Sequence, residues 1–267
     1  MRLPDPDTVT AAIREAAELD VLPRFRALEK DEVKEKAPGD VVTQADIDAE
    51  HRLTRSLTDL LPGSEVVGEE AFAQDEAVLD RFGGSDAVWI VDPVDGTANF
   101  AAGKEQFCMM VALAVGGAPR MSWIHDPINN LTAIAEQGAG AFYGGSRLRV
   151  PPAPSIEGMS GSINIGFWPH DERQKLRARA SRFASVLSLR CAGLDFLQLS
   201  LGERHFSVFR RLWPWDHVPG VLLFAEAGGA VRRMDGEPYR ARDRVYGLLS
   251  AADEEAWQSV RDYLMAD

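Results

Sequence analysis

The sequence has few cysteines and no long apolar segment. Two cysteines in 267 residues, Cys108 and Cys191, are too few for a disulfide framework and match a reducing compartment. The longest apolar run, residues 108–115, is far shorter than the roughly 20 residues of a membrane-spanning helix. The N-terminus lacks the apolar core of a signal peptide. We therefore expect a cytoplasmic protein that does not bind membranes.

Basic residues and histidine clusters are also scarce. The 29 Lys and Arg residues stand against 41 Asp and Glu residues, which gives a formal net charge of −12. A phosphate backbone is bound by clustered Lys and Arg, so the composition argues against a nucleic-acid partner. The 5 histidines show no i, i+4 pairing and lie far from either cysteine in the sequence, so the pattern does not predict a zinc site.

Helical and strand-like patterns alternate in both halves of the chain, which predicts a layered α+β or α/β fold. The proline-rich residues 150–155 indicate a junction, so we expect a single domain, 1–267, with subdomains of about 1–150 and 151–267. Helices are expected over residues 9–19, 44–61, 171–186, 195–201, 216–227 and 254–265. Strands are expected over residues 65–68, 87–91, 107–115, 120–125, 131–136, 160–167, 188–191, 205–210 and 245–250.

The densest polar signal follows the strand expected at 87–91. Asp92 and Asp95 stand directly after it, followed by Gly96 and Thr97. Two carboxylates this close repel each other unless one is protonated or a cation lies between them, and Mg²⁺ prefers such oxygen ligands. The amides of Gly96 and Thr97 could hold a phosphate oxygen. An Asx-type turn explains the two Asp residues equally well without a metal.

Three further acidic positions have both a structural and a functional explanation. Glu69 follows an apolar strand, as a site carboxylate would, but a solvent-exposed turn after the strand explains its position equally simply. Asp216 stands between bulky rings at a helix start, where an N-cap is the simpler explanation. Asp46 pairs with Thr43 in a capping signal that needs no catalytic role.

The segment Asp-Pro-x-Asp-Gly-Thr-x-Asn-Phe at 92–100 resembles the first signature of the inositol monophosphatase family of Mg²⁺-dependent, lithium-sensitive phosphatases. Residues 215–220 and 226–229 are similar to the second signature, Trp-Asp-x-Ala-x-Gly followed by Glu-Ala-Gly-Gly. Residues 42–46 and 68–70 stand in family order, so the resemblance runs from about residue 9 to 250. It implies an αβαβα five-layer sandwich of the inositol monophosphatase and fructose-1,6-bisphosphatase type, and a homodimer.

The resemblance also implies the site residues, around two or three Mg²⁺ ions. Implied metal ligands are the carboxylates of Glu69, Asp92, Asp95 and Asp216 and the main-chain carbonyl of Val94. Implied catalytic residues are Asp46, Glu69 and Thr97, of which Asp46 and Thr97 would orient and help to deprotonate the attacking water. Implied substrate contacts are Asp95, Gly96, Thr97, Gly193, Asp195 and Asp216, although Asp195 would serve equally well as the N-cap of its own helix. Either Lys34 or Lys36 is expected near the site, and the spacing does not decide between them.

The predicted activity is hydrolysis of a small phosphorylated metabolite, with inositol monophosphate as the first candidate. Histidinol phosphate, fructose 1,6-bisphosphate and 3′-phosphoadenosine nucleotides are the alternatives, because Phe209 stands where relatives that act on inositol phosphate typically carry Glu. We expect Pro219 in the first turn of its helix and His217 at the surface. A catalytically idle, metal- or metabolite-binding regulator is the non-enzyme alternative, and the presence of every implied metal carboxylate argues against it.

Overall fold

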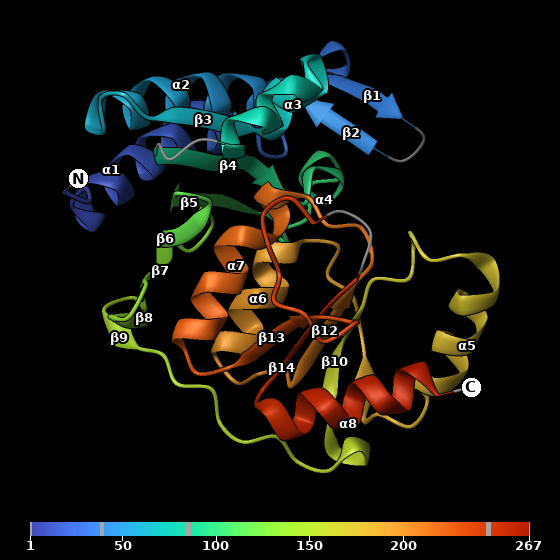
Figure 1. The fold of residues 1–267 in the computed structure, drawn as a ribbon. Helices are drawn as coiled ribbons and strands as arrows, with labels where there is room; N and C mark the ends of the chain where they lie inside the picture. Colours follow the sequence, from blue (N-terminus) through green and yellow to red (C-terminus); the bar gives the residue numbers. More distant parts are fainter. Residues whose placement is uncertain (1, 38–39, 84–86, 244–246, 267) are drawn as a thin grey trace.

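The computed structural model describes residues 2–37, 40–83, 87–243 and 247–266, which form a stack of helices and sheets (Figure 1). Helices α1 (Pro6–Ala16) and α2 (Gln44–Leu60) cover one face of a seven-stranded sheet. Helices α6 (Ala192–Ser200) and α7 (Pro214–Glu226) lie between this sheet and a five-stranded one. Helices α5 (His170–Ala180) and α8 (Glu254–Met265) cover the far face. The αβαβα order confirms the predicted fold class.

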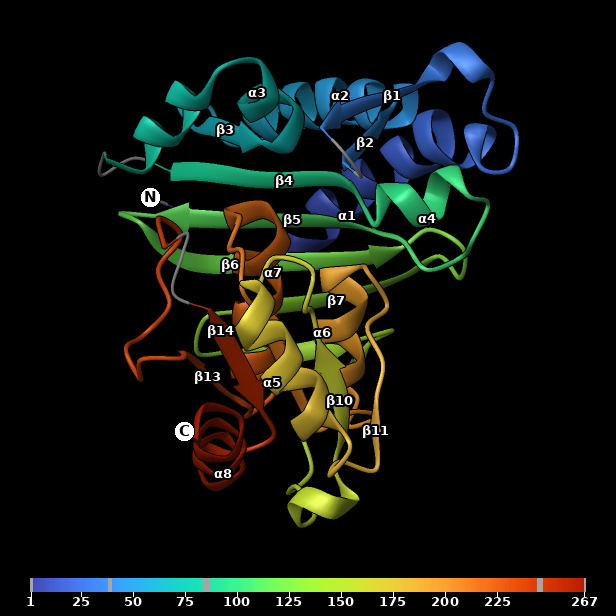
Figure 2. The same cartoon turned by 90° about the vertical axis from the view of Figure 1, so that its right-hand side faces the viewer.

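The seven-stranded sheet has the order β3-β4-β5-β6-β7-β8-β9. Its strands are β3 (Glu65–Gly68), β4 (Ala87–Asp95), β5 (Cys108–Val115), β6 (Ala118–Asp126), β7 (Leu131–Glu136), β8 (Gly140–Tyr143) and β9 (Ser146–Arg147). Among the described strands of this sheet, β3 and β4 pair in parallel and the other neighbours pair antiparallel; Figure 2 shows β4, β5 and β6 running beneath α2. Alternate residues of β4 face opposite layers: Trp89 packs in the core with α1 and α2, and Ile90 packs in the core with α7.

The five-stranded sheet has the order β11-β10-β12-β14-β13. Its strands are β10 (Ser160–Ile163), β11 (Ser185–Val186), β12 (Phe206–Phe209), β13 (Ala230–Arg233) and β14 (Leu248–Ala251). The strands of the two sheets divide at the proline-rich residues 150–155, although the division into two subdomains remains a prediction. None of the described helices is long and apolar enough to cross a membrane.

Several expected elements in the second half are wrong in extent or type. The helix expected over 171–186 ends at Ala180, because Phe183 turns inward and packs against Phe206 with ring centroids 4.4 Å apart. Residues 188–191 form no strand, since Arg190 has a left-handed φ of 58° that a strand does not accommodate. The strand expected over 245–250 begins only at Leu248 within the described residues.

A small ribbon beside the large sheet was not predicted. Strands β1 (Val33–Ala37) and β2 (Asp40–Thr43) pair antiparallel and lead directly into α2. Two short helices, α3 (Glu69–Gln74) and α4 (Thr97–Ala101), follow β3 and β4. The ribbon and both short helices border the candidate site.

Candidate active site

A cavity of about 840 Å³ opens where the ends of β3 and β4 meet the first turn of α7. Most of the implied site residues line it, namely Glu69, Asp92, Val94, Asp95, Gly96, Thr97, Asp195 and Asp216. Asp46 and Gly193 are buried, and each forms a hydrogen bond with one of these lining residues. Residues far apart in the sequence therefore converge on one cavity.

A bulge in β4 turns Asp92 and Asp95 to the same side of the sheet. Asp92 pairs with Met110 and Asp95 pairs with Cys108, so β4 carries one residue more than β5 across this step. In a regular strand, residues three apart point to opposite faces. The bulge falls at Pro93 and Val94, where Pro93 has no backbone N–H to donate to the ladder. Both carboxylates consequently point toward α6 and α7.

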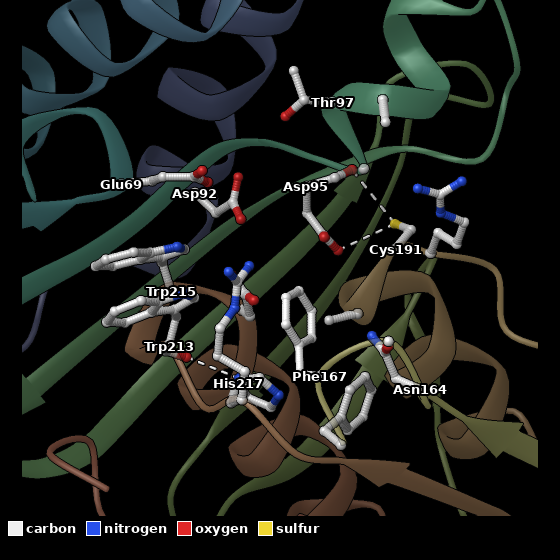
Figure 3. A pocket seen from close by; sticks show the side chains of 18 of the residues that line it. Glu69, Asp92, Asp95, Thr97, Asn164, Phe167, Cys191, Trp213, Trp215 and His217 are labelled. Carbon is white, nitrogen blue, oxygen red and sulfur yellow. Dashed lines mark hydrogen bonds between the residues drawn. The ribbon is translucent and has the colours of Figure 1, made fainter. Parts of the chain in front are cut away.

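Three carboxylates from three different elements form the centre of the site. Glu69 begins α3, Asp92 lies on β4 and Asp216 lies in the first turn of α7, and their carboxylate oxygens lie within 4.8 Å of one another. Figure 3 shows Glu69 and Asp92 side by side, with the stacked rings of Trp213 and Trp215 below them. Burial, followed by the negative charges of Glu69, Asp95 and Asp216, raises the pKa of Asp92 well above its ordinary value. A hard divalent cation fits this set, because it would neutralise carboxylates that otherwise repel one another.

The structure decides between the two candidate lysines. Lys36 Nζ donates to Glu69 Oε1 at 3.1 Å and to Glu70 Oε1 at 2.6 Å. Burial opposes the charge of Lys36, but the two carboxylates outweigh burial and raise its pKa. The β1–β2 register shifts between Glu35 and Ala37, so Lys36 is a bulged residue and leaves the face that Lys34 occupies.

Asp95 lies beside the three-carboxylate set and has partners of its own. Its Oδ2 accepts a hydrogen bond of 2.6 Å from the amide of Gly193 and lies 3.1 Å from Cys191 Sγ. Burial raises the pKa of Asp95, against the opposing effect of these hydrogen bonds. Gly193 is a tight packing point, since a Cβ there would lie 2.4 Å from Cys108 Sγ. Its contact with Asp95 was not foreseen from the sequence.

Asp46 forms the predicted capping box and also lies beside Thr97, while its catalytic role stays a prediction. Its Oδ2 closes the capping box of α2 by accepting from the Thr43 amide at 2.8 Å and the Thr43 hydroxyl at 2.5 Å. Its Oδ1 lies 3.1 Å from Thr97 Oγ1, which also lies 2.9 Å from the Val94 carbonyl. Burial raises the pKa of Asp46 to about 7. The Asp46 carboxylate, a proton acceptor, thus lies next to the Thr97 hydroxyl, which lines the cavity.

Gly96 is required where β4 turns into α4. It has a φ of 89°, which favours glycine, and a Cβ at this position would lie 2.8 Å from the Gln106 carbonyl. The tight turn places Thr97 as the first residue of α4, directly after the two aspartates of β4.

Several local explanations from the sequence are wrong. Trp213 is the N-cap of α7, so Asp216 does not cap it. Cys191 is the N-cap of α6, and Asp195 lies inside that helix, 3.4 Å from Arg204 Nη1. Glu69 begins a helix and does not form a solvated turn.

Two further expectations about α7 are also wrong. Pro219 lies beyond the first turn, because α7 begins at Pro214. His217 is 1% exposed, since its ring packs against Phe209 at 4.9 Å and its Nδ1 lies 2.9 Å from the Trp213 carbonyl. Burial lowers the pKa of His217 to about 4, so the ring is neutral at neutral pH.

Aromatic rings and guanidinium groups line the rest of the cavity, a feature that the sequence did not reveal. Phe167, Phe209 and Trp213 contribute rings, and Arg190 and Arg211 contribute positive charge. The Arg211 guanidinium lies 3.9 Å from the centre of the Phe167 ring and 5.6 Å from that of Trp213. Figure 3 shows the Phe167 ring on the far side of Asp95 from Thr97. The site therefore joins an acidic, metal-type half to an aromatic and cationic half.

The layered αβαβα fold and the acidic cavity agree with the class of phosphatases that the sequence resembles, and comparison with known proteins supports this class. Residues 5–264 match the inositol monophosphatase family, so the chain belongs to this family of phosphatases and the predicted resemblance is confirmed. A Thermotoga maritima protein named fructose-1,6-bisphosphatase/inositol-1-monophosphatase is 32% identical over 205 residues, covering 76% of this chain and 75% of the relative. The inositol-1-monophosphatase of Mesorhizobium japonicum is 34% identical over 221 residues, covering 79% of each. The Nus factor SuhB of Pseudomonas aeruginosa is 30% identical over 237 residues, covering 84% of this chain and 83% of the relative.

Solved structures show the same fold. The extragenic suppressor protein SuhB of Bartonella henselae has a TM-score of 0.84 and 27% identity, covering 97% of this chain and 98% of that one. The inositol monophosphatase of Thermotoga maritima has a TM-score of 0.81 and 26% identity, covering 97% of both chains.

Proposed function

We propose that the chain is a magnesium-dependent phosphomonoesterase that hydrolyses a small phosphorylated metabolite by direct attack of water on phosphorus. The convergence of Glu69, Asp92 and Asp216 within 4.8 Å, in a cavity large enough for a metabolite, carries this proposal. These carboxylates, with Asp95 and the Val94 carbonyl, would hold two or three Mg²⁺ ions. When bound, magnesium would supply positive charge to the phosphoryl oxygens and to the attacking oxygen.

Side chains and amides of the protein would orient the attacking water, take up its proton and bind the phosphate. Thr97 Oγ1 faces the cavity and lies 3.1 Å from Asp46 Oδ1, so it can accept a hydrogen bond from the attacking water while donating to Asp46. Asp46 is a buried carboxylate beside this hydroxyl, and burial raises its pKa in the metal-free protein to about 7, so Asp46 is the group that would take up the proton. The amides of Gly96 and Thr97 hold a phosphate oxygen, and Lys36 holds Glu69 in position. This route needs no covalent phosphoenzyme.

The aromatic half of the cavity supports a substrate whose leaving group is planar and carries a further negative charge. Phe209 is 3% exposed and offers no acceptor to a polyol hydroxyl. Planar rings stack on aromatic side chains and guanidinium groups, and Arg190 and Arg211 suit an anion. Among the four candidate substrates, 3′-phosphoadenosine nucleotides have both properties. Histidinol phosphate has a ring but a cationic amine, and inositol monophosphate, the first candidate from overall resemblance, has no planar ring.

Phosphate release from para-nitrophenyl phosphate, with and without Mg²⁺, tests the reaction class. We expect turnover that requires Mg²⁺, and its absence would refute the phosphatase proposal. A panel of the four candidate substrates, ranked by kcat/KM, tests the leaving group separately. We expect the nucleotide to exceed inositol monophosphate by about tenfold or more. The reverse ranking would refute the planar leaving group and leave the reaction class intact.

Four further properties rest on the family resemblance and stay part of this proposal. They are a homodimeric state, lithium sensitivity, a cytoplasmic location, and catalytic competence as opposed to an idle regulatory role. Retention of Glu69, Asp92 and Asp216 in one cluster supports competence, because relatives that have lost catalysis usually lose some of their metal carboxylates. Light scattering coupled to size-exclusion chromatography tests the dimer.

A further inference from the structure

The only two cysteines of the sequence meet beside Asp95, on the flank of the cavity. Cys108 begins β5 and Cys191 caps α6, and their Sγ atoms lie 3.7 Å apart across a sequence separation of 83 residues. Asp95 Oδ2 lies 3.1 Å from Cys191 Sγ and 3.7 Å from Cys108 Sγ. Two sulfur atoms and one carboxylate oxygen thus form a compact triangle (Figure 3 shows the Asp95–Cys191 side).

The dimensions of this triangle match three corners of a tetrahedral zinc site. With Zn–S bonds of about 2.3 Å, two sulfur ligands lie about 3.8 Å apart. With a Zn–O bond of about 2.0–2.2 Å, a sulfur and an oxygen ligand lie about 3.6 Å apart. The two observed separations of 3.7 Å therefore differ from these values by about 0.1 Å, and the separation of 3.1 Å between Cys191 Sγ and Asp95 Oδ2 needs to widen by about 0.5 Å.

The surroundings of the triangle suit a metal site in two further ways. The Gly193 amide donates a hydrogen bond of 2.6 Å to Asp95 Oδ2. Such a hydrogen bond holds a ligating carboxylate in position for a metal. Asp95 and Cys191 line the cavity, so a cation can enter and a water can complete its coordination, while Cys108 is fully buried behind them. Gly193 permits this closeness, because any Cβ there would collide with Cys108 Sγ.

We propose that Asp95, Cys108 and Cys191 form a site for zinc or another thiophilic divalent cation, with water as the fourth ligand. Each thiol binds as a thiolate, so two protons leave as one cation binds. The neighbouring set of Glu69, Asp92 and Asp216 offers oxygen alone and suits a hard cation, so the two sites select different metals. Zinc binding lowers magnesium-dependent turnover, because it engages the carboxylate of Asp95, which we also assign to magnesium. Zinc binding itself does not rest on the proposed phosphatase activity.

Cobalt(II) is the probe for binding, since its thiolate complexes show a sulfur-to-metal charge-transfer band in the near ultraviolet. The reduced, metal-free chain is titrated with Co²⁺ in buffer that contains Mg²⁺. We expect the band and the visible spectrum of tetrahedral cobalt to saturate at one equivalent, and zinc to abolish both. Absence of the charge-transfer band at saturating cobalt would overturn the proposal.

Three variants locate the cation. Cys108→Ser and Cys191→Ser should each lose the spectrum of a two-thiolate site, whereas Glu69→Gln, in the oxygen-only set, should retain it. Retention of the full band in both serine variants would show that the two cysteines do not bind the cation together and would overturn the proposal. Circular dichroism of each variant verifies that it folds.

X-ray absorption of the zinc-loaded parent chain tests the site without any substitution. We expect two sulfur scatterers at about 2.3 Å and two lighter ones at about 2.0 Å. A first shell of oxygen and nitrogen alone would refute the site even if the serine variants did not fold. Turnover of the parent chain with and without one equivalent of zinc tests the inhibition separately, and zinc-bound protein of unchanged turnover would refute the inhibitory role alone.

Discussion

The Asp92→Asn substitution is expected to abolish turnover while making the metal-free protein more stable. Asp92 is 1% exposed, and its carboxylate lies within 4.8 Å of those of Glu69 and Asp216. Two full charges at that distance repel each other by about 3 kcal/mol at an effective dielectric constant of about 20. Protonation already relieves part of this repulsion, since the pKa of Asp92 is raised, and Lys36 neutralises part of the charge on Glu69. We therefore expect a net gain of about 2 kcal/mol in the free energy of unfolding without metal.

Thermal unfolding in EDTA and in Mg²⁺ measures this effect. A gain of about 2 kcal/mol corresponds to a rise of about 5 °C in Tm for a chain of this size. Magnesium at about a hundred times its Kd stabilises the parent by about 2.7 kcal/mol, whereas the variant has lost a ligand and gains little. The order of stability should therefore reverse when Mg²⁺ is added, and phosphate release by the variant should fall to background.

The matched control is Asp262→Asn, which removes a charge whose side chain is 63% exposed on α8, outside the site. It should leave both melting temperatures and the turnover of the parent unchanged. The electrostatic reasoning is refuted if the Asp92→Asn protein in EDTA melts at or below the parent. It is equally refuted if Mg²⁺ raises the Tm of parent and variant by the same amount.

Four other predictions test separate parts of the site. Thr97→Val should lower kcat by about a hundredfold or more with little change in KM, because it removes the hydroxyl beside Asp46, and Thr97→Ser should restore most of the rate in the same assay. Phe209→Glu should raise the kcat/KM ratio of inositol monophosphate to 3′-phosphoadenosine nucleotide by about tenfold, and an unchanged ratio would contradict the planar-leaving-group proposal. Lys36→Met should lower the Tm in EDTA through loss of about 1–3 kcal/mol, whereas Lys34→Met, on the exposed face, should not. In EDTA the free energy of unfolding of Glu50→Gln should fall less steeply, or rise more steeply, than that of the parent between about pH 4.5 and about 7, since burial raises the pKa of Glu50 from 4.5 to about 7; urea titrations of both proteins at several pH values measure this difference.

The acidic half of the site could be predicted because its signals are local. An apolar strand that ends in carboxylates is visible in the sequence: Glu69 follows β3, and Asp92 lies near the end of β4. The order of these motifs along the chain then matched a known family. The helices that carry Asp46 and Asp216 were also expected, although Asp216 was misjudged as a possible cap because its helix begins earlier, at Pro214.

The contacts around the cysteine pair and around Phe209 could not be predicted, because they depend on which distant segments of the chain pack together. Cys108 and Cys191 are distant in the sequence, so their 3.7 Å contact exists only after α6 packs on β5. Likewise, the ring of His217 packs against Phe209, although the sequence suggested that His217 is exposed. Contacts between layers carry no sequence period, so neither pattern nor spacing reveals them.

The two bulges explain why the site needs tertiary structure to be understood. One extra residue in β4 turns Asp95 to the side of Asp92, and the register shift in β1 turns Lys36 toward Glu69. Without the β4 bulge, Asp95 would point into the apolar core with Trp89 and carry an unpaired charge there, which costs several kcal/mol. The fold therefore has a stability reason as well as a functional one to keep the bulge. A proline in an otherwise central strand was the one local sign of it, because such a residue cannot donate to the strand ladder.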